Sequence, residues 1–304
     1  MKANISLLGS LAVAGLALVG CQKPAEKTAA GSTAASTTVT TSTETSSSMA
    51  GKTIRIATEG TYKPFSITKA DGSLTGFDVD FMQALCAQMK ANCEIKPQDW
   101  DGLLPGLMAK KYDVVIDAMS ITPERQAQVD FTDPYFTNTL VFLTKQGSPI
   151  NPDDPAQIDS HTVAAQRSTL STQWMEKNHP KAKLNLYEGL DNAFMDLAAG
   201  RSDMMISDKA PAAYWLTTPE GKGFEIKGKE IDVNDKMGII VRKGDPLRLE
   251  FNKAIATLKS NGTYDKIYNQ YFGSATTTTA AASSVAVTVS STTATTTTVA
   301  STSK

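Results

Sequence analysis

The sequence is short of histidine, cysteine and basic runs, and each shortage argues against a class of protein. Its two histidines, His161 and His179, have no companion at the spacing of a metal ligand, which argues against a zinc enzyme or a serine–histidine triad. No metal or other cofactor is therefore expected. The formal net charge is −1 and positive residues form no run, so nucleic acid is not an expected partner. Beyond the N-terminal segment, no apolar run is long enough to cross a bilayer.

The N-terminal segment does carry an apolar run. Residues 1–20 place a lysine, an apolar stretch and then small residues in the order of a lipoprotein signal peptide. The stretch "LVGC" resembles a bacterial lipobox, which implies cleavage before Cys21 and a lipid on its sulfur. An ordinary secretory peptide beside an unrelated cysteine is the alternative. Gln22 is not an acidic signal for retention in the inner membrane, so we expect a periplasmic protein anchored by its lipid to a bacterial membrane, with the outer membrane weakly preferred.

Two segments of low complexity flank the part of the chain that can fold. Residues 21–51 are mostly Ser, Thr and Ala, and so are residues 274–304. Neither segment can bury enough apolar surface to offset the entropy lost on ordering. We expect the first to be a tether and the second a disordered tail, which leaves residues 52–273 as the folded core.

Short apolar strands, such as the one expected at residues 237–243, alternate with amphipathic helices within that core. In the segment 77–89, for example, Phe77, Phe81, Leu85 and Met89 recur every four residues, which is the spacing of one helix face. Alternation of this kind favours parallel α/β sheets, and two such series indicate two lobes. Functional sites in these sheets lie at the carboxyl ends of strands. The segments at those positions are residues 59–65, 99–101, 117–125, 166–171 and 207–209.

Cys86 and Cys93 are the only cysteines in the core. Seven residues of continuous helix would hold their Cα atoms about 10.5 Å apart, whereas a disulfide needs about 4.4–6.8 Å. A bridge therefore requires the helix to end between them, and Asn92 could supply a left-handed C-cap there. Export from the cytoplasm favours oxidation. We expect the disulfide, and two buried thiols are the alternative.

One cation stands where a helix disfavours positive charge. In "DAMSITPERQAQVDF", residues 117–131, Thr122 suits an N-cap and Pro123 the first helical position, which makes Arg125 the third helical residue. The helix N-terminus already carries partial positive charge. A bound anion would explain Arg125, because backbone N–H groups near Ser120 and a forked guanidinium together can hold a carboxylate or a phosphate.

A local ion pair to Asp130 or Asp133, or plain solvation of the side chain, is the alternative explanation for Arg125. Two other acids argue against it, since Asp117 and Asp208 both end apolar strands, where an acid seldom lies without a partner. One cation and several acids around a cleft match a zwitterion, whose carboxylate would meet Arg125 and whose ammonium would meet the acids. A phosphate ligand fits less well, because the surplus acids would repel it.

Five motifs together carry a resemblance to a known family. They are "IRIATEGTYKPF", "GSLTGFDVDFMQALC", "WDGLLPGLMAKKYDVVI", "MSITPERQAQVDFTDPYF" and "NGTYDKIYNQYF". Over residues 52–273 the chain resembles the solute-binding proteins of ABC importers for polar amino acids, which bind lysine, arginine, ornithine, histidine or glutamine. The resemblance implies an α/β fold of the type II periplasmic-binding-protein kind, in which two lobes joined by two crossing strands close over the ligand. It places lobe 1 at residues 52–139 plus 240–273 and lobe 2 at residues 140–239.

The resemblance also implies which residues hold the carboxylate end of the ligand. Arg125 matches the arginine that binds the α-carboxylate, and Ser120 matches the hydroxyl and N–H beside it. Thr169 and Leu170 match the turn of lobe 2 that offers N–H groups to the same carboxylate. Ser168 replaces the glycine that the family usually has in this turn, so the resemblance does not define the shape of the turn.

Other matched positions lie at the ammonium and side-chain ends. Ala118 matches the position whose carbonyl faces the α-ammonium, and Asp208 matches the carboxylate that pairs with that ammonium. Tyr62 matches an aromatic wall, and Trp100 lies where a pocket-lining side chain sits. Glu59 falls where several members place an acid against the ligand side chain.

Two acids indicate the kind of ligand side chain. Asp117 stands where the family commonly has serine or another small residue, and with Glu59 it favours a cationic side chain: arginine, lysine, ornithine or histidine. Trp100 could cover a guanidinium, and the cysteine pair also resembles the basic-amino-acid members. Glutamine is the alternative, if Glu59 hydrogen-bonds an amide. An acidic ligand is least expected, because only Arg167 could meet a second carboxylate and its side chain is expected to point to solvent.

We therefore expect a monomeric binding protein, not an enzyme, that captures a basic amino acid by hinge closure and delivers it to the permease of an ABC importer. Two minor alternatives use the same scaffold. One is an enzyme like cyclohexadienyl dehydratase, with Glu59 or Asp117 as general acid, although the sequence shows no nucleophile–base pair. The other is a sensory module that presents ligand occupancy to a receptor.

Overall fold

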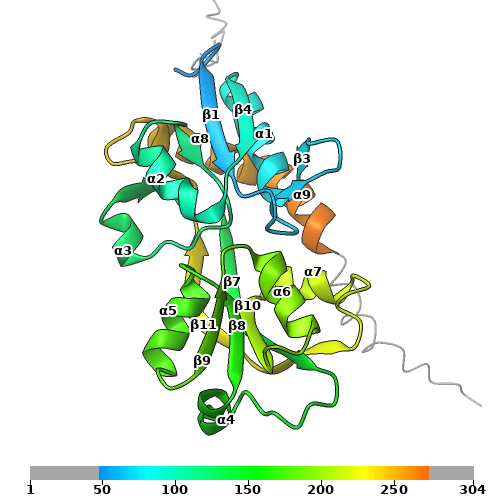
Figure 1. The fold of residues 1–304 in the computed structure, drawn as a ribbon. Helices are drawn as coiled ribbons and strands as arrows, with labels where there is room; N and C mark the ends of the chain where they lie inside the picture. The colour runs from blue at the N-terminus through cyan, green and yellow to red at the C-terminus, as the bar shows by residue number, and fades with distance from the viewer. Residues whose placement is uncertain (1–47, 274–304) are drawn as a thin grey trace, which may run out of the picture. The chain divides into compact units, whose positions relative to one another are not determined.

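The computed structural model describes residues 48–273 (Figure 1). The predictions for the signal peptide, for Cys21 and for the tail at residues 274–304 lie outside this range, as does most of the predicted tether. The described residues form two five-stranded sheets and one two-stranded hairpin, with helices packed on the sheets. None of these helices has both the length and the apolar character that crossing a membrane requires.

The first sheet has five strands, which are β1 (Thr53–Thr58), β4 (Asn92–Pro97), β5 (Val114–Val115), β6 (Val129–Phe131) and β12 (Ile240–Arg242). β1 runs parallel to both β4 and β5, whereas β12 runs antiparallel to β5 and β6. The other elements of this part are the hairpin strands β2 (Ile67–Thr68) and β3 (Leu74–Thr75), α1 (Phe77–Met89), the 3₁₀ turn η1 (Trp100–Gly102), α2 (Leu103–Met108), α3 (Pro123–Gln126), α8 (Leu247–Ser260) and α9 (Thr263–Phe272).

The second sheet also has five strands, in the order β11 (Phe224–Met237), β7 (Phe136–Lys145), β10 (Met204–Asp208), β8 (Thr162–Gln166) and β9 (Lys183–Tyr187). β8 runs parallel to β9 and β10, and β7 runs antiparallel to β10 and β11 (Figure 1). The helices of this part are α4 (Pro155–Ser160), α5 (Leu170–Asn178), α6 (Leu190–Ala198) and α7 (Lys209–Leu216).

β7 and β11 carry the chain between the sheets. The chain enters β7 shortly after β6 of the first sheet, and it returns from β11 to β12 through Gly238 and Ile239. The two strands also pair with each other. They are the two crossing strands that the resemblance implies, so the predicted fold class of two joined α/β lobes is confirmed. The residue boundaries of the lobes stay predictions.

Two details of the predicted strands are wrong. The sheets are mixed rather than parallel, because β7 and β12 lie where the chain passes from one sheet to the other and run against their neighbours. The predicted strand at residues 237–243 is split between β11 and β12. Gly238 lies at the split, where a Cβ atom would come within 3.0 Å of Ile121 and 3.1 Å of Phe131. A continuous apolar run does not reveal that its two ends belong to different sheets.

The predicted apolar face of α1 forms the centre of the core beside the first sheet. Phe77, Phe81 and Leu85 are fully buried, and Met89 is nearly so. α1 packs against α8 and α9, and the ring of Phe77 lies 5.1 Å from that of Phe272. The four-residue spacing in the sequence therefore identified the buried face of this helix correctly.

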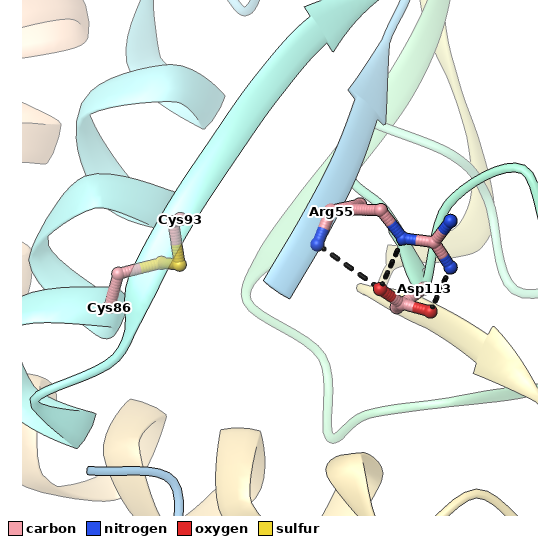
Figure 2. The surroundings of a disulfide bond; sticks show 4 residues. All are labelled: Arg55, Cys86, Cys93 and Asp113. Carbon is pink, nitrogen blue, oxygen red and sulfur yellow. Dashed lines mark hydrogen bonds and ion pairs between the residues drawn. A yellow bond between two sulfur atoms is a disulfide. The ribbon is translucent and has the colours of Figure 1, made fainter. Parts of the chain in front are cut away.

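The expected disulfide joins Cys86 on α1 to Cys93 on β4, with their Cα atoms 6.1 Å apart (Figure 2). The predicted cap was wrong by two residues: Lys90, with φ of 55°, ends the helix, and Asn92 already begins β4. The early turn is required because β4 pairs with β1 from its first residue. The N–H of Ala91 closes the turn on the carbonyl of Cys86 at 3.0 Å.

Replacing both Cys86 and Cys93 with serine should lower the free energy of unfolding by about 2–3 kcal/mol, because the bridge restricts the unfolded chain. Urea denaturation of the variant and the wild type measures this difference. A reductant should destabilise the wild type by a similar amount and leave the variant unchanged. Equal stability of the two oxidised proteins would contradict the prediction.

Candidate functional site

Strands of both sheets deliver polar side chains to one buried site. Glu59 follows β1, Asp117 lies two residues beyond β5, Gln166 ends β8 and Asp208 ends β10. Hydrogen bonds between the lobes hold these ends together: Gln166 Nε2 donates to Glu59 at 3.2 Å, and the Tyr62 hydroxyl donates to Asp208. All five side chains are buried. The strand-end rule therefore located these polar groups from the sequence.

Arg125 lies in this site on α3, where the sequence predicted it. Thr122 caps the helix and accepts a hydrogen bond from the Arg125 N–H at 3.3 Å. The guanidinium donates through Nη1 to the Ser120 carbonyl at 2.8 Å and through Nη2 to the Ser168 carbonyl, on the other lobe, at 2.9 Å. Burial lowers the pKa of Arg125 to about 10, because desolvation outweighs the nearby acids. Within residues 48–273 the bonds to Ser120 and Ser168 are the hydrogen bonds of the guanidinium, so its remaining N–H donors are available for an anion.

The local ion pair considered for Arg125 is not what the structure contains. Asp130 accepts instead from Lys243 at 3.0 Å and from the Gly244 N–H at 2.8 Å, and within residues 48–273 the guanidinium of Arg125 donates to two carbonyl groups rather than to Asp133. Among residues 48–273, Arg125 is the only buried lysine or arginine. The cation is therefore kept inside the site.

Asp117 is held rigidly and leaves one oxygen open. Its Oδ1 accepts hydrogen bonds from Thr58 Oγ1 at 2.8 Å, the Glu59 N–H at 2.9 Å and Ser66 Oγ at 2.9 Å. Its Oδ2 is buried and has no hydrogen-bond partner in the described part of the chain. Burial raises the pKa of Asp117 to about 6, although the three donors oppose this.

Glu59 lies beside Asp117 and contacts lobe 2. It accepts hydrogen bonds from Thr61 at 2.7 Å and from Gln166 at 3.2 Å. Burial, followed by repulsion from Asp117, raises the pKa of Glu59 to about 8. Gln166 donates also to the Glu188 carbonyl, and its own Oε1 is buried without a partner within residues 48–273. The side chains of Glu59, Asp117 and Gln166 therefore offer several hydrogen-bond acceptors at one end of the site.

Asp208 supplies a further acid from the end of β10. Burial, and then the charge of Asp235, raise the pKa of Asp208 to about 7, while the Tyr62 hydroxyl and Asn138 lower it. The ring of Tyr62 stacks on Phe65 with centroids 5.9 Å apart, which fixes the hydroxyl that donates to Asp208.

Ala118 has a left-handed backbone with φ of 44°. Its N–H donates to Asp78 Oδ2 at 2.6 Å and to the Tyr135 hydroxyl at 3.1 Å. Burial and the neighbouring Asp117 raise the pKa of Asp78 to about 8. The strained backbone at Ala118 is thus held in place by two buried side chains.

The turn at residues 168–170 begins α5. Thr169 is the N-cap in a capping box with Thr172, and Leu170 is the first helical residue. Ser168 has φ of 61°, a left-handed conformation that glycine adopts most readily. Ser168, which replaces the glycine usual in this turn, therefore keeps the backbone conformation that a glycine would adopt.

Trp100 and Arg167 make contacts that the sequence did not indicate. The ring of Trp100 lies 5.5 Å from the Arg125 guanidinium, and its Nε1 donates to the Arg167 carbonyl at 3.1 Å. The Arg167 side chain was expected to point to solvent. It is exposed, as expected, and it also pairs with Asp101 at 2.5 Å and with Glu188 at 3.4 Å.

Sequence reasoning missed Gln166 and Asp235 as individual members of the site. Gln166 lay in a named strand-end segment but received no role. Asp235 is buried on β11, and its only signal in the sequence was an acid just before an apolar strand. Within residues 48–273, the site therefore combines the one buried guanidinium, that of Arg125, with four buried acids, namely Glu59, Asp117, Asp208 and Asp235. The charges of Asp208 and Asp235 act directly on Arg125. Within residues 48–273, no three potential ligands are grouped so as to hold a metal ion.

Comparison with known proteins gives consistent matches. Residues 54–274 match the model of the bacterial extracellular solute-binding proteins, family 3. The L-arginine-binding protein of Pseudomonas aeruginosa is 36% identical over 231 residues, which are 73% of this chain and 89% of that protein. The lysine/arginine/ornithine-binding periplasmic protein of Escherichia coli is 36% identical over 228 residues, which are 73% of this chain and 88% of that protein.

Solved structures of similar fold carry related descriptions. An ancestral arginine-binding protein bound to arginine matches with a TM-score of 0.70 and 36% identity, over 74% of this chain and 100% of its own. An ancestral arginine-binding protein bound to glutamine matches with a TM-score of 0.69 and 36% identity, over 73% of this chain and 98% of its own. An ancestral amino-acid-binding protein described as a precursor of cyclohexadienyl dehydratase matches with a TM-score of 0.66 and 35% identity, over 72% of this chain and 95% of its own.

The raised pKa values of the acids predict how the unliganded protein responds to pH. The folded state holds protons on Glu59, Asp117 and Asp208 more tightly than the unfolded chain does, with pKa values of about 8, 6 and 7. This contribution to stability is complete below about pH 4 and is lost as the pH rises through these values. Glu59→Gln should therefore reduce the loss of stability between pH 5 and pH 8.5, by on the order of 1–2 kcal/mol.

Urea denaturation at several pH values measures the slope of the free energy of unfolding against pH. Glu94→Gln is the matched control, because Glu94 is exposed on β4 away from the site and should leave the slope unchanged. Equal slopes for the wild type and Glu59→Gln would show that Glu59 does not hold an extra proton in the folded state.

Proposed function

The chain belongs to the bacterial extracellular solute-binding proteins, family 3, and from this premise we propose that it captures a free basic amino acid and delivers it to an ABC importer. Relatives named for arginine, and for lysine, arginine and ornithine, support this ligand class. The independent support comes from the charges of the candidate site.

The surplus of buried acid is the observation that carries the proposal. Within residues 48–273, four buried carboxyl groups share the site with one buried guanidinium, and burial raises the pKa of all four. A zwitterionic backbone adds no net charge, so it would leave this surplus uncompensated. A ligand with a cationic side chain would offset it, because ionised acids in a buried site need a nearby positive charge.

The backbone charges of the ligand would lie at opposite sides of the site. Arg125 and the N–H groups near Ser120 would hold the α-carboxylate from lobe 1, and the turn of Thr169 and Leu170 would add N–H groups from lobe 2. Asp208 and the carbonyl of Ala118 would hold the α-ammonium. The free donors of Arg125, which already contacts both lobes, support this arrangement.

The side chain of the ligand would extend toward Glu59, Asp117 and Gln166. Asp117 Oδ2 and Gln166 Oε1 are acceptors without partners among the described residues, and Glu59 lies between them. A guanidinium has five N–H donors and matches such a set of acceptors. Tyr62 would form a wall of the pocket. Trp100 covers Arg125, and we propose that it also borders the ligand.

Glutamine is the second candidate ligand. The amide of a glutamine could donate to Glu59 and to Gln166 Oε1, and an ancestral arginine-binding protein of the same fold is described as bound to glutamine. The acid surplus disfavours it, because an amide leaves the charges of Glu59 and Asp117 unpaired.

We propose binding without catalysis. The family and the named relatives are solute-binding proteins, although one structural neighbour is described as the precursor of a dehydratase. Glu59 could hold a proton at neutral pH, as a general acid must. Recovery of unaltered ligand after prolonged incubation would separate binding from turnover.

Hinge closure would couple binding to delivery. The contacts of Arg125 with Ser168, of Glu59 with Gln166 and of Tyr62 with Asp208 all join the lobes, so they can form only when the lobes are closed. A ligand that touches both lobes stabilises the closed form by its differential affinity. A permease would then recognise the closed form of a monomer tethered by lipid at Cys21, in the periplasm and preferably on the outer membrane. A receptor that senses occupancy is the alternative partner.

Arg125→Ala should weaken arginine binding by a hundredfold or more, because removing one partner of a buried charge pair costs about 3–5 kcal/mol. Titration calorimetry measures the affinity. Arg55→Ala is the control, since Arg55 is half exposed and pairs with Asp113 at 2.8 Å on the first sheet, beside the disulfide in Figure 2. A folded Arg125→Ala protein with unchanged affinity would refute the assignment of the carboxylate seat.

Glu59→Gln should change selectivity rather than binding in general. The affinity for arginine should fall by about ten- to a hundredfold, because a charge-assisted hydrogen bond becomes a neutral one, whereas that for glutamine should change little. Competition against labelled ligand measures both. Glu188→Gln, which alters an exposed acid outside the pocket, should keep the wild-type ratio. Equal losses for both ligands would argue against a side-chain role for Glu59.

A further inference from the structure

Asp235 is a buried acid on the crossing strand β11, and none of the proposed ligand contacts involves it. It lies opposite Asn138 of β7 and is only 3% exposed. The register of the two strands shifts between Ile231 and Asp235, and Asn234 has φ of 53°. Irregularities of this kind re-aim a side chain and are common next to functional sites.

The hydrogen bonds of Asp235 use only one of its two oxygens. Oδ2 accepts from Asn138 Nδ2 at 2.9 Å and from Ser120 Oγ at 3.2 Å. Oδ1 is buried and has no hydrogen-bond partner within the part of the chain that the structure describes. A buried carboxylate oxygen without a donor is unfavourable, so this position favours a ligand that supplies one.

Asp208 lies near Asp235, and this second acid indicates what kind of hydrogen-bond donor Oδ1 of Asp235 would bind. Asp235 is the main charge that raises the pKa of Asp208, and Asn138 lowers the pKa of both acids. Asp208 comes from the end of β10 and Asp235 from β11, and both acids interact with the amide of Asn138. Two buried like charges at close range are stabilised by a cation between them.

We propose that Asp235 and Asp208 together bind the α-ammonium of the captured amino acid, with Oδ1 of Asp235 accepting a hydrogen bond from one of its N–H groups. This inference rests on the proposed function and deepens it. An ammonium has three N–H donors, so it can serve both acids and the Ala118 carbonyl at once. Asp235 also contacts Ser120, which places the ammonium seat beside the seat for the carboxylate.

The assignment separates Asp235 from the residues that select the ligand side chain. A change at Asp235 should weaken arginine, lysine and glutamine by similar factors, because all three carry the same ammonium. A ligand without the α-amino group should be insensitive to the change. A merely structural role in the hinge would affect ligands with and without that group alike.

Asp235→Asn is the sharpest variant for this test. The asparagine keeps an oxygen to accept from Asn138 and Ser120, and it replaces only the unpartnered Oδ1 with an NH₂ group. Asp232→Asn is the matched control, because Asp232 lies three residues away on the same strand and is exposed. Affinities for arginine and for 5-guanidinopentanoate, which lacks the α-amino group, would be measured by calorimetry and by competition at high concentration.

Arginine should bind Asp235→Asn at least about thirtyfold more weakly than wild type, while the affinity for 5-guanidinopentanoate should change less than threefold. Equal losses for both ligands, or an unchanged affinity for arginine, would overturn the inference and leave the proposed function standing. A wild-type protein that binds neither compound would overturn both. A crystal structure of the wild type with arginine gives a test that needs no variant: an α-nitrogen beyond hydrogen-bond distance of Asp235 would also reject the assignment.

Discussion

Closure of the two lobes buries more negative charge than positive, and the binding site depends on this imbalance. Glu59, Asp117, Asp208 and Asp235 are brought together with Arg125 as the single buried guanidinium of residues 48–273. Burial in the closed form raises the pKa values of these four acids, so they hold their protons more tightly than exposed acids do. A cationic amino acid would replace those protons with a charge of its own. The ligand would therefore complete the electrostatics of the closed state rather than fill an already neutral cavity.

In the closed form, the scaffold itself holds these charges in place. Three donors fix one oxygen of Asp117, and the Tyr62 hydroxyl fixes Asp208. Arg125 contacts a carbonyl on each lobe. The site lies between strand ends of two sheets, and the two strands that connect those sheets carry Asn138 and Asp235. A change of the angle between the lobes would thus alter the site directly, which links ligand capture to closure.

The sequence predicted those features that depend on local chemistry. The face of α1 followed from the spacing of its apolar residues, and the position of Arg125 followed from Thr122 and Pro123 at the start of α3. The family resemblance supplied the connection of the lobes, which is confirmed. The mixed direction of the sheets, the cap at Lys90 and the burial of Asp235 depend on how distant segments meet, and no local pattern carries that information. The burial of Asp235 follows from the pairing of β11 with β7, which the sequence alone does not reveal.

If the buried acids select the ligand, the site must require a positive charge on the ligand side chain. Citrulline tests this requirement most directly, because it has the size and shape of arginine but an uncharged side chain. Calorimetric titration of the wild-type protein at neutral pH should find that arginine binds at least about a hundredfold more tightly than citrulline. Equal affinities for the two compounds would contradict this expectation and show that the buried acids do not select charge.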